Sequence, residues 1–407
     1  MRQSWKPSVK IEPAEYHQRQ RALAAAISAD GHDGALVVSR GGSTLDRYGN
    51  VFYLTGHYQH YSYLPESPPT FSGRAHSALA LARDGRNALC VAVPEVDEIH
   101  VFADRVTHSD RWVETVRDAL QSLGLHKAQV LLIGADVLPT EHWLALQDLL
   151  PDVTWQFGDQ TIEALRRIKS PTELEMIRRA AAINRDAVTA FADAIQPGAT
   201  EADAVAAAAA VAARHGAGLY YAAVSSGEGT WAWMSSPLPG WSTRKLERGD
   251  LVRLDLSVSY NGYLSDFGRT WVCGGSATPD QARLIKTMQD GIDAAIAAVH
   301  PGGTVAEIIA AGDAALADAG VAMNGAAEHE GQIVASYPVH WGHCLGMGWE
   351  RPWMTMPGDD RIEPGMYLAI ERALTLEGVG TAAAEQNLLV NESGIELLTG
   401  GPDGRWS

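Results

Sequence analysis

An Asn-Gly dipeptide at positions 261 and 262 constrains the folding of this chain more than any other short segment. The residues before it, Leu251–Tyr260, alternate apolar and polar side chains in the way that a half-buried β-strand does. Asn-Gly is the preferred centre of a two-residue type I′ turn, which joins two antiparallel strands. We therefore predict a β-hairpin in which Tyr260 faces Tyr263 across the turn.

The register of this hairpin places two aspartates on one face of the sheet. Counting outward from the turn, Ser257 faces Asp266 and Asp255 faces Gly268, so the two carboxylates are diagonal neighbours. Such neighbours lie roughly 7 Å apart, a separation at which bare carboxylates repel each other but one or two bound cations would bridge them. A solvated face is the alternative interpretation of the pair taken alone.

Two further acids and a histidine stand in strongly patterned sequence. Glu371 ends an apolar run that begins at Met366, Glu385 interrupts another run at 382–390, and His343 lies in a glycine-containing segment. A charged carboxylate in a largely buried strand is costly unless it is paired, protonated or coordinated. Shared metal coordination explains the whole set, and its oxygens with one imidazole suit manganese, iron, cobalt or zinc.

The order of these motifs resembles a known group of enzymes. The motifs are Asp255 in Leu-Asp-Leu, Asp266 in Asp-Phe-Gly-Arg-Thr, His343 in Gly-His-Cys-Leu-Gly, Glu371 in Pro-Gly-Met-Tyr-Leu-Ala-Ile-Glu, and Glu385 in Glu-Gln-Asn-Leu-Leu-Val. Together they resemble the pita-bread metallohydrolase superfamily, which contains creatinase, aminopeptidase P, prolidase and methionine aminopeptidase, and also members that are not peptidases. The segment 165–171 resembles the approach to the catalytic domain of that group, so the resemblance covers most of the chain.

The resemblance implies two divalent metal ions that share a bridging water and are held by these five residues. Manganese is the first expectation, with iron, cobalt or zinc as the other candidates. Glu371 is implied to shuttle a proton as well as to bind metal, which makes it a catalytic candidate. His340, three residues before His343, is the rival imidazole ligand or else a residue of the substrate pocket.

The expected fold is α/β (α+β) with two domains. Residues 1–160 are expected to form a creatinase/prolidase-like α/β domain, which includes strands at 34–39 and 129–134. Residues 161–407 are expected to form a pita-bread catalytic domain with pseudo-twofold symmetry. A capping signature, Ser170-Pro171-Thr172-Glu173, begins its first helix.

A short internal repeat agrees with the pseudo-twofold expectation. Pro197-Gly198-Ala199-Thr200 and Pro301-Gly302-Gly303-Thr304 each give a turn and a threonine cap, followed by an acid three residues later and an alanine-rich helix. The first half would supply the two aspartates, and the second half would supply His343 and the two glutamates. Two unrelated helix starts are the alternative interpretation.

Departures from the family pattern fall on residues that handle substrate. A histidine of the peptidase members is replaced at Trp233 or Met234, and a second one, seven residues after the metal histidine, is replaced by Glu350. We expect a retained metal centre that acts on something other than an ordinary peptide. Glu350 would then serve as a catalytic acid or fix a cationic group, or it would only pair with Arg351.

Aromatic and basic residues near the motifs are the substrate-binding candidates. They are Trp231, Trp233, His340, Trp349 and Arg372. Tryptophans are ordinarily packed in the core, but tryptophan rings also bind cationic groups by cation-π attraction. Arg269 and Arg372 are most simply explained as residues that orient the carboxylates.

Composition excludes several classes of function. The formal net charge of −17, with no Lys/Arg cluster, argues against nucleic acid and anionic membranes as partners. The chain shows neither an apolar signal core nor a span of about 20 apolar residues, so we expect a cytoplasmic protein. Three scattered cysteines exclude a disulfide framework.

The resemblance implies a homodimer, in which the aromatic loop His57–Tyr63 would complete a neighbour's site.

The favoured function is metal-dependent hydrolysis of a C–N, amide-type bond in a dipeptide or a small amino-acid-derived or cationic molecule, as in the Xaa-Pro peptidases. A lyase on the same scaffold, like the family branch that cleaves dimethylsulfoniopropionate, is the first alternative. A metal-free binding module is the second, although all five metal positions are retained.

Overall fold

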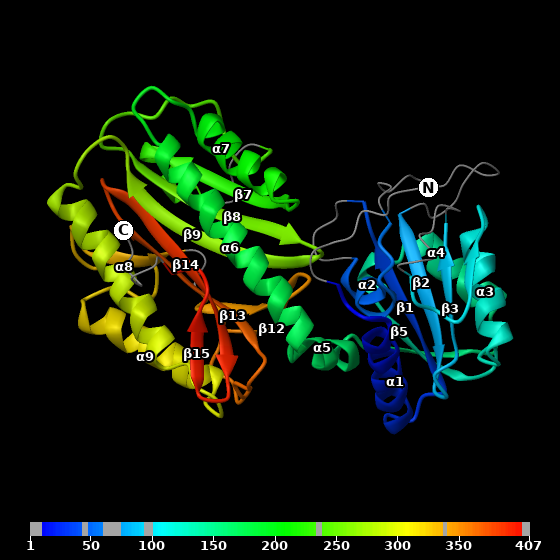
Figure 1. The fold of residues 1–407 in the computed structure, drawn as a ribbon. Helices are drawn as coiled ribbons and strands as arrows, with labels where there is room; N and C mark the ends of the chain where they lie inside the picture. The colour runs from blue at the N-terminus through cyan, green and yellow to red at the C-terminus, as the bar shows by residue number, and fades with distance from the viewer. Residues whose placement is uncertain are drawn as a thin grey trace. The chain divides into compact units, whose positions relative to one another are not determined.

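The computed structural model describes residues 10–42, 48–59, 75–92, 101–232, 238–336 and 340–400, and the chain divides into two compact units (Figure 1). The first unit spans Met1–Arg166 and the second spans Arg167–Ser407. Both units mix helices and strands, which confirms the expected α/β class. No helix in the described ranges is both long enough and apolar enough to span a bilayer.

The first unit is built on one six-stranded sheet in the order β4-β3-β2-β1-β5-β6. Its elements are α1 (Pro13–Ala29), β1 (Gly34–Arg40), α2 (Gly49–Thr55), β2 (His76–Ala82), β3 (Asn87–Val91), β4 (Val106–His108), α3 (Trp112–Ser122), β5 (Gln129–Ile133), η1 (Ala135–Val137), α4 (Thr140–Leu149), β6 (Thr154–Phe157) and α5 (Gln160–Arg167). Helices α3 and α4 bury Trp112, Leu120 and Leu146 against the apolar sheet residues Leu36 and Val38. The two strands expected from the sequence correspond to β1 and β5.

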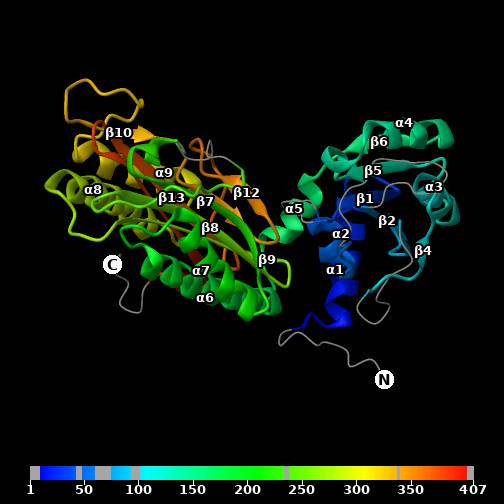
Figure 2. The same ribbon diagram turned by 90° about the horizontal axis from the view of Figure 1, so that it is seen from above.

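The second unit contains two antiparallel sheets that carry the candidate site (Figure 2). Its elements are α6 (Pro171–Ala194), α7 (Glu201–Arg214), β7 (Gly218–Ser226), η2 (Gly227–Trp231), β8 (Leu251–Tyr260), β9 (Tyr263–Val272), α8 (Pro279–Ala297), α9 (Val305–Asp318), β10 (Ile333–Ser336), β11 (Gly342–Leu345), β12 (Trp349–Trp353), β13 (Tyr367–Leu376), β14 (Gly380–Asn391) and β15 (Gly394–Leu397). One sheet runs β7-β8-β9, and the other runs β12-β11-β13-β14-β15 with β10 also paired to β13. Helix α6 packs on β8 and β9, whereas α8 packs on β13 and β14.

The predicted hairpin is confirmed residue by residue. Tyr260 pairs with Tyr263, Ser257 with Asp266, and Asp255 with Gly268. The turn residues Asn261 and Gly262 have φ values of 49° and 83°, which is the left-handed geometry that a type I′ turn requires. Local turn chemistry alone therefore fixes the register of β8 against β9.

Capping boxes begin the helices at the predicted positions. Ser170 and Glu173 cap α6, and the helix buries an apolar stripe that includes Ile177, Val188 and Phe191. Each box satisfies two backbone N–H groups that the first helical turn leaves without an intrahelical acceptor.

The two halves of the second unit repeat the same arrangement. Thr200 caps α7 and bridges to Lys245, and Thr304 caps α9 and bridges to Arg361. In both halves a long strand begins six residues after the residue that bridges to the threonine. Strand β8 begins at Leu251, six residues after Lys245, and β13 begins at Tyr367, six residues after Arg361. Asp255 is the fifth residue of β8 and Glu371 is the fifth residue of β13. The first aspartate and the first glutamate therefore occupy equivalent positions in the two halves.

Side-chain hydrogen bonds join the two sheets along β9 and β14. The Asn387 Oδ1 atom accepts from the backbone N–H of Asp266 at 2.9 Å and from the Ser265 hydroxyl at 2.9 Å. Thr270 bonds both the carbonyl and the N–H of Ala383, at 2.8 and 2.9 Å. These bonds hold the backbone of one metal-site candidate at a fixed position against the other sheet.

Replacing Gly262 with alanine tests the hairpin. A non-glycine residue in left-handed geometry costs roughly 1–2 kcal/mol, so G262A is expected to lower the free energy of unfolding by about that amount. Urea denaturation measures it. Gly218→Ala, in β7 of the same sheet, is the control, because its φ is not left-handed and an added Cβ meets nothing within 4 Å. Equal stability of G262A and the unmodified protein would contradict the turn assignment.

Candidate metal centre

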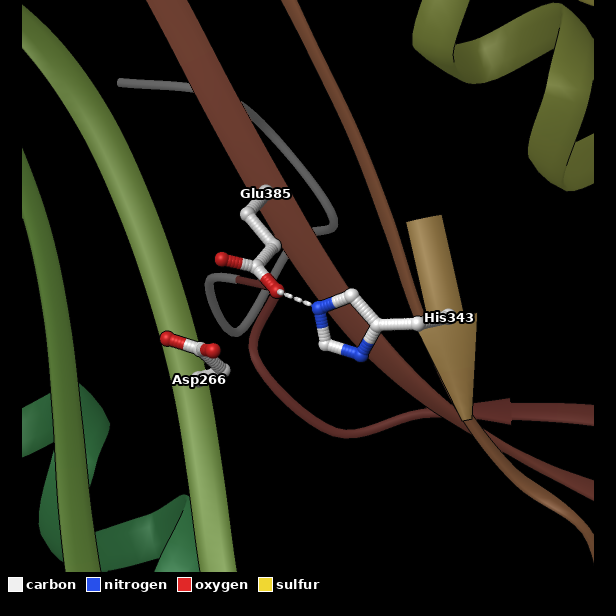
Figure 3. Close-up of side chains that lie close together, drawn as sticks. All are labelled: Asp266, His343 and Glu385. Carbon is white, nitrogen blue, oxygen red and sulfur yellow. Dashed lines mark ion pairs between the residues drawn. The ribbon is translucent and has the colours of Figure 1, made fainter. Parts of the chain in front are cut away.

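Three buried side chains from three strands meet at one point. Asp266 on β9, His343 on β11 and Glu385 on β14 each offer a ligand atom, and these atoms all lie within 4.8 Å of one another (Figure 3). The three residues are 3%, 2% and 3% exposed. One imidazole and two carboxylates in this arrangement are a donor set suited to a divalent cation.

The two remaining predicted ligands lie beside this group. The Glu371 Oε1 atom is 3.5 Å from His343 Nε2, and Glu371 pairs directly with Glu385 across β13 and β14. Asp255 shares a face of the hairpin with Asp266, as the register requires. Asp255 and Glu371 are less buried than the other three, so this side of the cluster is nearer to solvent. All five side chains predicted from the sequence therefore come together.

Electrostatics make the cluster unfavourable without a cation. Burial, followed by the charges of Asp266 and Glu371, raises the pKa of Asp255 well above its usual value. The same causes, burial first, raise the pKa of Glu385 well above normal. Burial and then Asp266 raise the pKa of Glu371 to about 8. Carboxylates that disfavour their own charge to this degree are a marker of functional sites.

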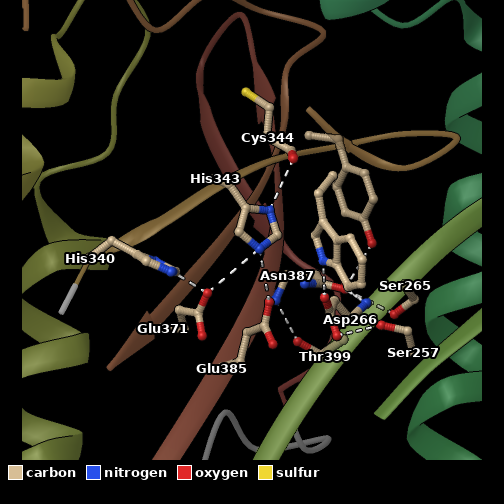
Figure 4. Close-up of polar contacts among 12 residues, drawn as sticks. Ser257, Ser265, Asp266, His340, His343, Cys344, Glu371, Glu385, Asn387 and Thr399 are labelled. Atoms are coloured by element: carbon tan, nitrogen blue, oxygen red, sulfur yellow. Dashed lines mark hydrogen bonds and ion pairs between the residues drawn. The ribbon is translucent and has the colours of Figure 1, made fainter. Parts of the chain in front are cut away.

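The imidazole of His343 is oriented by a backbone hydrogen bond. Its Nδ1 atom lies 3.0 Å from the carbonyl oxygen of Cys344, and because a carbonyl only accepts, Nδ1 carries the proton (Figure 4). The Nε2 lone pair then faces the carboxylates, with Glu385 Oε1 at 4.0 Å. This is the tautomer that a metal-binding histidine needs.

Both oxygens of Asp266 receive a hydrogen bond from the protein. Ser257 Oγ donates to Oδ1 at 2.6 Å, and Trp349 Nε1 donates to Oδ2 at 2.6 Å. The serine comes from the adjacent strand β8 and the tryptophan from β12, so two sheets fix one carboxylate.

Two buried oxygens of the cluster show that a divalent ion fits it. Within the described part of the chain, Asp255 Oδ1 and Glu385 Oε1 have no hydrogen-bond partner. A buried oxygen anion without a donor is strongly disfavoured, and a cation among these oxygens would satisfy both.

His340 and Trp353 border the cluster. His340 Nδ1 lies 3.4 Å from Glu371 Oε1, and burial, with smaller contributions from His343 and Arg372, lowers the pKa of His340 to about 4. The Trp353 ring lies 4.6 Å from the His343 ring and 5.4 Å from the His340 ring, centroid to centroid. His340 therefore lies beside the predicted ligands, and burial disfavours its protonated form.

Glu350 forms a buried ion pair with Lys169. Its carboxylate is 2.8 Å from the ammonium of Lys169, with side chains that are 10% and 1% exposed. It pairs with Cys344 on β11, whereas Trp349 pairs with Leu345, and successive strand residues point to opposite faces. The structure thus turns Trp349, rather than Glu350, toward Asp266, which argues against the expected catalytic role of Glu350.

The other substrate-binding candidates have different placements. Trp231 ends η2 and is 72% exposed, which does not fit the wall of a buried pocket. Arg372 is buried with its guanidinium 5.0 Å from the Trp341 ring, on the face of β13 opposite Glu371. Trp233, Met234 and residues 60–63 of the aromatic loop lie outside the described residues.

Two neighbours of the site were not predicted from the sequence. Arg253 is buried on the same face of β8 as Asp255, and burial lowers its pKa to about 10 against the opposing effects of Asp255 and Glu371. Strand alternation at positions 253 and 255 was a usable signal for it. Tyr221 on β7 pairs with Ser257, and burial followed by Asp255 raises its pKa. No sequence signal set the β7 register, because a bulge interrupts it between Leu219 and Tyr221.

Comparison with known proteins gives a consistent result along the chain. The sequence pattern of Metallopeptidase family M24 matches residues 175–392, and that of the Creatinase/Prolidase N-terminal domain matches residues 19–168. The probable dipeptidase PepE of Mycobacterium bovis is 29% identical over 396 residues, with 96% of each chain covered. The Xaa-Pro dipeptidase of Pyrococcus furiosus is 28% identical over 247 residues, which cover 59% of this chain and 65% of that one.

Solved structures share the architecture. The dipeptidase PepE of Mycobacterium ulcerans superposes with a TM-score of 0.75 at 26% identity, covering 97% of this chain and 98% of that one. The prolidase of Pyrococcus horikoshii shares the fold, with a TM-score of 0.74 at 20% identity over 94% of this chain and 98% of that one.

Fold and site together define a metallohydrolase with a creatinase-like N-terminal domain. The chain belongs to metallopeptidase family M24, whose sequence pattern matches more than half of it. The protein is therefore a metal-dependent hydrolase, and its family implies divalent metal ions. The resemblance and the fold class expected from the sequence are both confirmed.

Replacing Lys169 with methionine tests the buried ion pair. K169M leaves the Glu350 carboxylate without its cation, which is expected to cost about 3–5 kcal/mol in the free energy of unfolding. The double variant Lys169→Met, Glu350→Leu should recover most of that loss. Lys286→Met, which breaks an exposed pair with Asp290, is the control and should change stability by less than about 1 kcal/mol. Urea denaturation compares them, and a K169M loss no larger than that of K286M would contradict the assignment.

Proposed function

We propose that this protein is a dinuclear metallohydrolase that cleaves an amide bond in a dipeptide-sized, amino-acid-derived substrate. The proposed ligands are Asp255, Asp266, His343, Glu371 and Glu385. The observation that carries the proposal is the convergence of these five side chains, with two carboxylate oxygens left without donors in the described part of the chain. The similarity to proteins named dipeptidases supports a substrate of that size.

The donor set accommodates manganese, iron, cobalt or zinc, and we propose manganese as the first ion to test. When bound, such ions would lower the pKa of a coordinated water and polarise the scissile carbonyl. The residues of the chain would then need to orient the substrate and move protons.

Glu371 is the residue best placed to carry a proton. It is the more accessible of the paired glutamates, at 12% side-chain exposure against 4% for Glu385. In the metal-free protein, burial and then the charge of Asp266 raise its pKa to about 8, and a bound cation would lower that pKa again. His340 borders this carboxyl group, with Nδ1 3.4 Å from Glu371 Oε1 but without a hydrogen bond among the described residues. We propose that Glu371 transfers a proton to the leaving nitrogen.

Aromatic rings would form the sides of the substrate pocket. Trp353 is 39% exposed and lies against His343, and Tyr220 and Tyr221 lie against Trp349. Such rings suit the apolar side chains of a small peptide and also a cationic group by cation-π attraction.

A substrate panel tests the proposed function. Metal-depleted protein is reloaded with Mn²⁺, Co²⁺, Fe²⁺ or Zn²⁺ and incubated with Xaa-Pro dipeptides, other dipeptides, small amides and sulfonium acids, and the products are identified by mass spectrometry. Release of an amine and an acid from one class supports a hydrolase, whereas an alkene product would indicate the lyase alternative. Fast turnover of ordinary Xaa-Pro dipeptides would contradict the expectation that the histidine replacements changed the substrate.

Asp266→Asn removes a carboxylate from the centre of the cluster. Ligand loss is expected to lower turnover by roughly 100-fold or more and to reduce the bound metal, as measured by steady-state kinetics and elemental analysis. The matched control is Asp290→Asn on the exposed face of α8, which should leave both quantities unchanged. Full activity of D266N would refute the ligand set.

Metal binding is expected to release protons. Because the pKa of Glu371 is raised in the folded protein, that group stabilises the metal-free fold at low pH, and this contribution is lost as the pH rises through about 8. Cations displace the proton, so stabilisation by Mn²⁺ should be larger at pH 8 than at pH 6. Thermal melts at the two pH values, with calorimetric titrations in buffers of different ionisation enthalpy, measure the effect. A gain that does not vary with pH would contradict the raised pKa.

A further inference from the structure

We propose that Trp349 is a positioning residue of the metal centre, and that its indole N–H, rather than its aromatic surface, sets how tightly the centre binds divalent ions. This inference rests on the proposed function, because it assumes that Asp266 is a ligand. The sequence alone suggested a different role for Trp349, as part of a substrate-binding wall.

The hydrogen bonds to Asp266 limit the directions from which it can bind metal. An ionised carboxylate has about two lone-pair directions on each oxygen. Ser257 uses one direction on Oδ1 and Trp349 uses one on Oδ2, both at 2.6 Å. Each oxygen therefore keeps one lone pair for a cation, and the carboxylate plane is fixed by donors from two separate strands.

The chemical nature of these donors matters as much as their position. A hydroxyl and an indole are both neutral, so they orient the carboxylate without cancelling the negative charge that attracts a cation. An arginine or lysine in the same place would compete with the metal ion. Outer hydrogen bonds of this kind are worth about 10- to 100-fold in metal affinity.

The surroundings of Trp349 hold its ring in position. The rings of Tyr220 and Tyr221 lie 6.3 Å and 6.0 Å from it, edge to face. The next residue, Glu350, points to the other face of β12 and is fixed there by Lys169. The tyrosine rings thus constrain the indole, and the Glu350–Lys169 pair constrains the backbone of β12. An indole held in this way can orient the Asp266 carboxylate reproducibly.

Trp349→Phe removes the N–H and keeps an aromatic ring. Mn²⁺ affinity of metal-depleted protein, measured by calorimetric titration, is expected to fall 10- to 100-fold relative to the unmodified protein. Trp271→Phe is the matched control, since that tryptophan lies on β9 with Asp266 but packs against Phe191 of α6, on the opposite face of the strand. Its affinity should stay within about threefold, a smaller change than loss of an orienting hydrogen bond produces.

A second pair of variants keeps the inference testable if W349F folds poorly. Ser257→Ala removes the other donor and should weaken Mn²⁺ binding by a similar factor, whereas Ser257→Thr keeps the hydroxyl and should restore it. The visible absorption of Co²⁺-loaded protein provides a readout that a purely structural role would not move. It should change in W349F and S257A but not in W271F.

The outcomes separate this inference from the proposed function. Absence of stoichiometric metal binding by the unmodified protein would overturn both. Normal binding by the unmodified protein with unchanged affinity and an unchanged Co²⁺ spectrum in W349F would overturn the role of Trp349 alone.

Discussion

Repulsion among carboxylates is the constraint on which the second unit depends. Asp255, Asp266, Glu371 and Glu385 are brought together where burial raises the pKa of three of them, and such a cluster is tolerated only with protons or cations among its oxygens. The groups that orient the ligands are neutral: a hydroxyl, an indole and a backbone carbonyl. Buried Arg253 is one cationic neighbour that offsets part of the negative charge, and Arg269 and Arg372 are others.

The fold meets this constraint by dividing the acids between two similar halves. Asp255 and Glu371 occupy the same place in their respective strands, and the hydrogen bonds of Asn387 and Thr270 hold β9 against β14. Gly268 lies at this junction, where a Cβ would meet the carbonyl oxygen of Leu254 at 3.2 Å and the Cβ of Glu385 at 3.4 Å. In this site Asp266, His343 and Glu385 are buried, while Asp255 and Glu371 are nearer to solvent. That asymmetry suits a centre that must admit a substrate.

The tight segment between β11 and β12 shows how residue counting misleads. Glu350 is the seventh residue after His343, and the family resemblance placed it at a position that faces substrate. Pairing of Leu345 with Trp349 across the turn puts the indole on the His343 face and the carboxylate on the Lys169 face. A shift of one residue along a strand reverses which side chain faces the site.

Trp231 is exposed because it lies at the end of a short 3₁₀ turn, η2. A turn of this kind carries no periodic pattern in the sequence from which the exposure of its residues could be predicted.

The sequence by itself determined what depends on local geometry. Asn261-Gly262 set the hairpin register, and with it the shared face of Asp255 and Asp266. The threonine caps fixed where α7 and α9 begin. Both depend on local geometry because turns and caps involve residues that are close along the chain. Only the tertiary structure decided that Trp349 reaches Asp266, that Lys169 pairs with Glu350, and that Tyr221 lies beside the cluster. Those contacts join residues far apart in the chain, and their partners are chosen by packing between sheets, which no local pattern encodes.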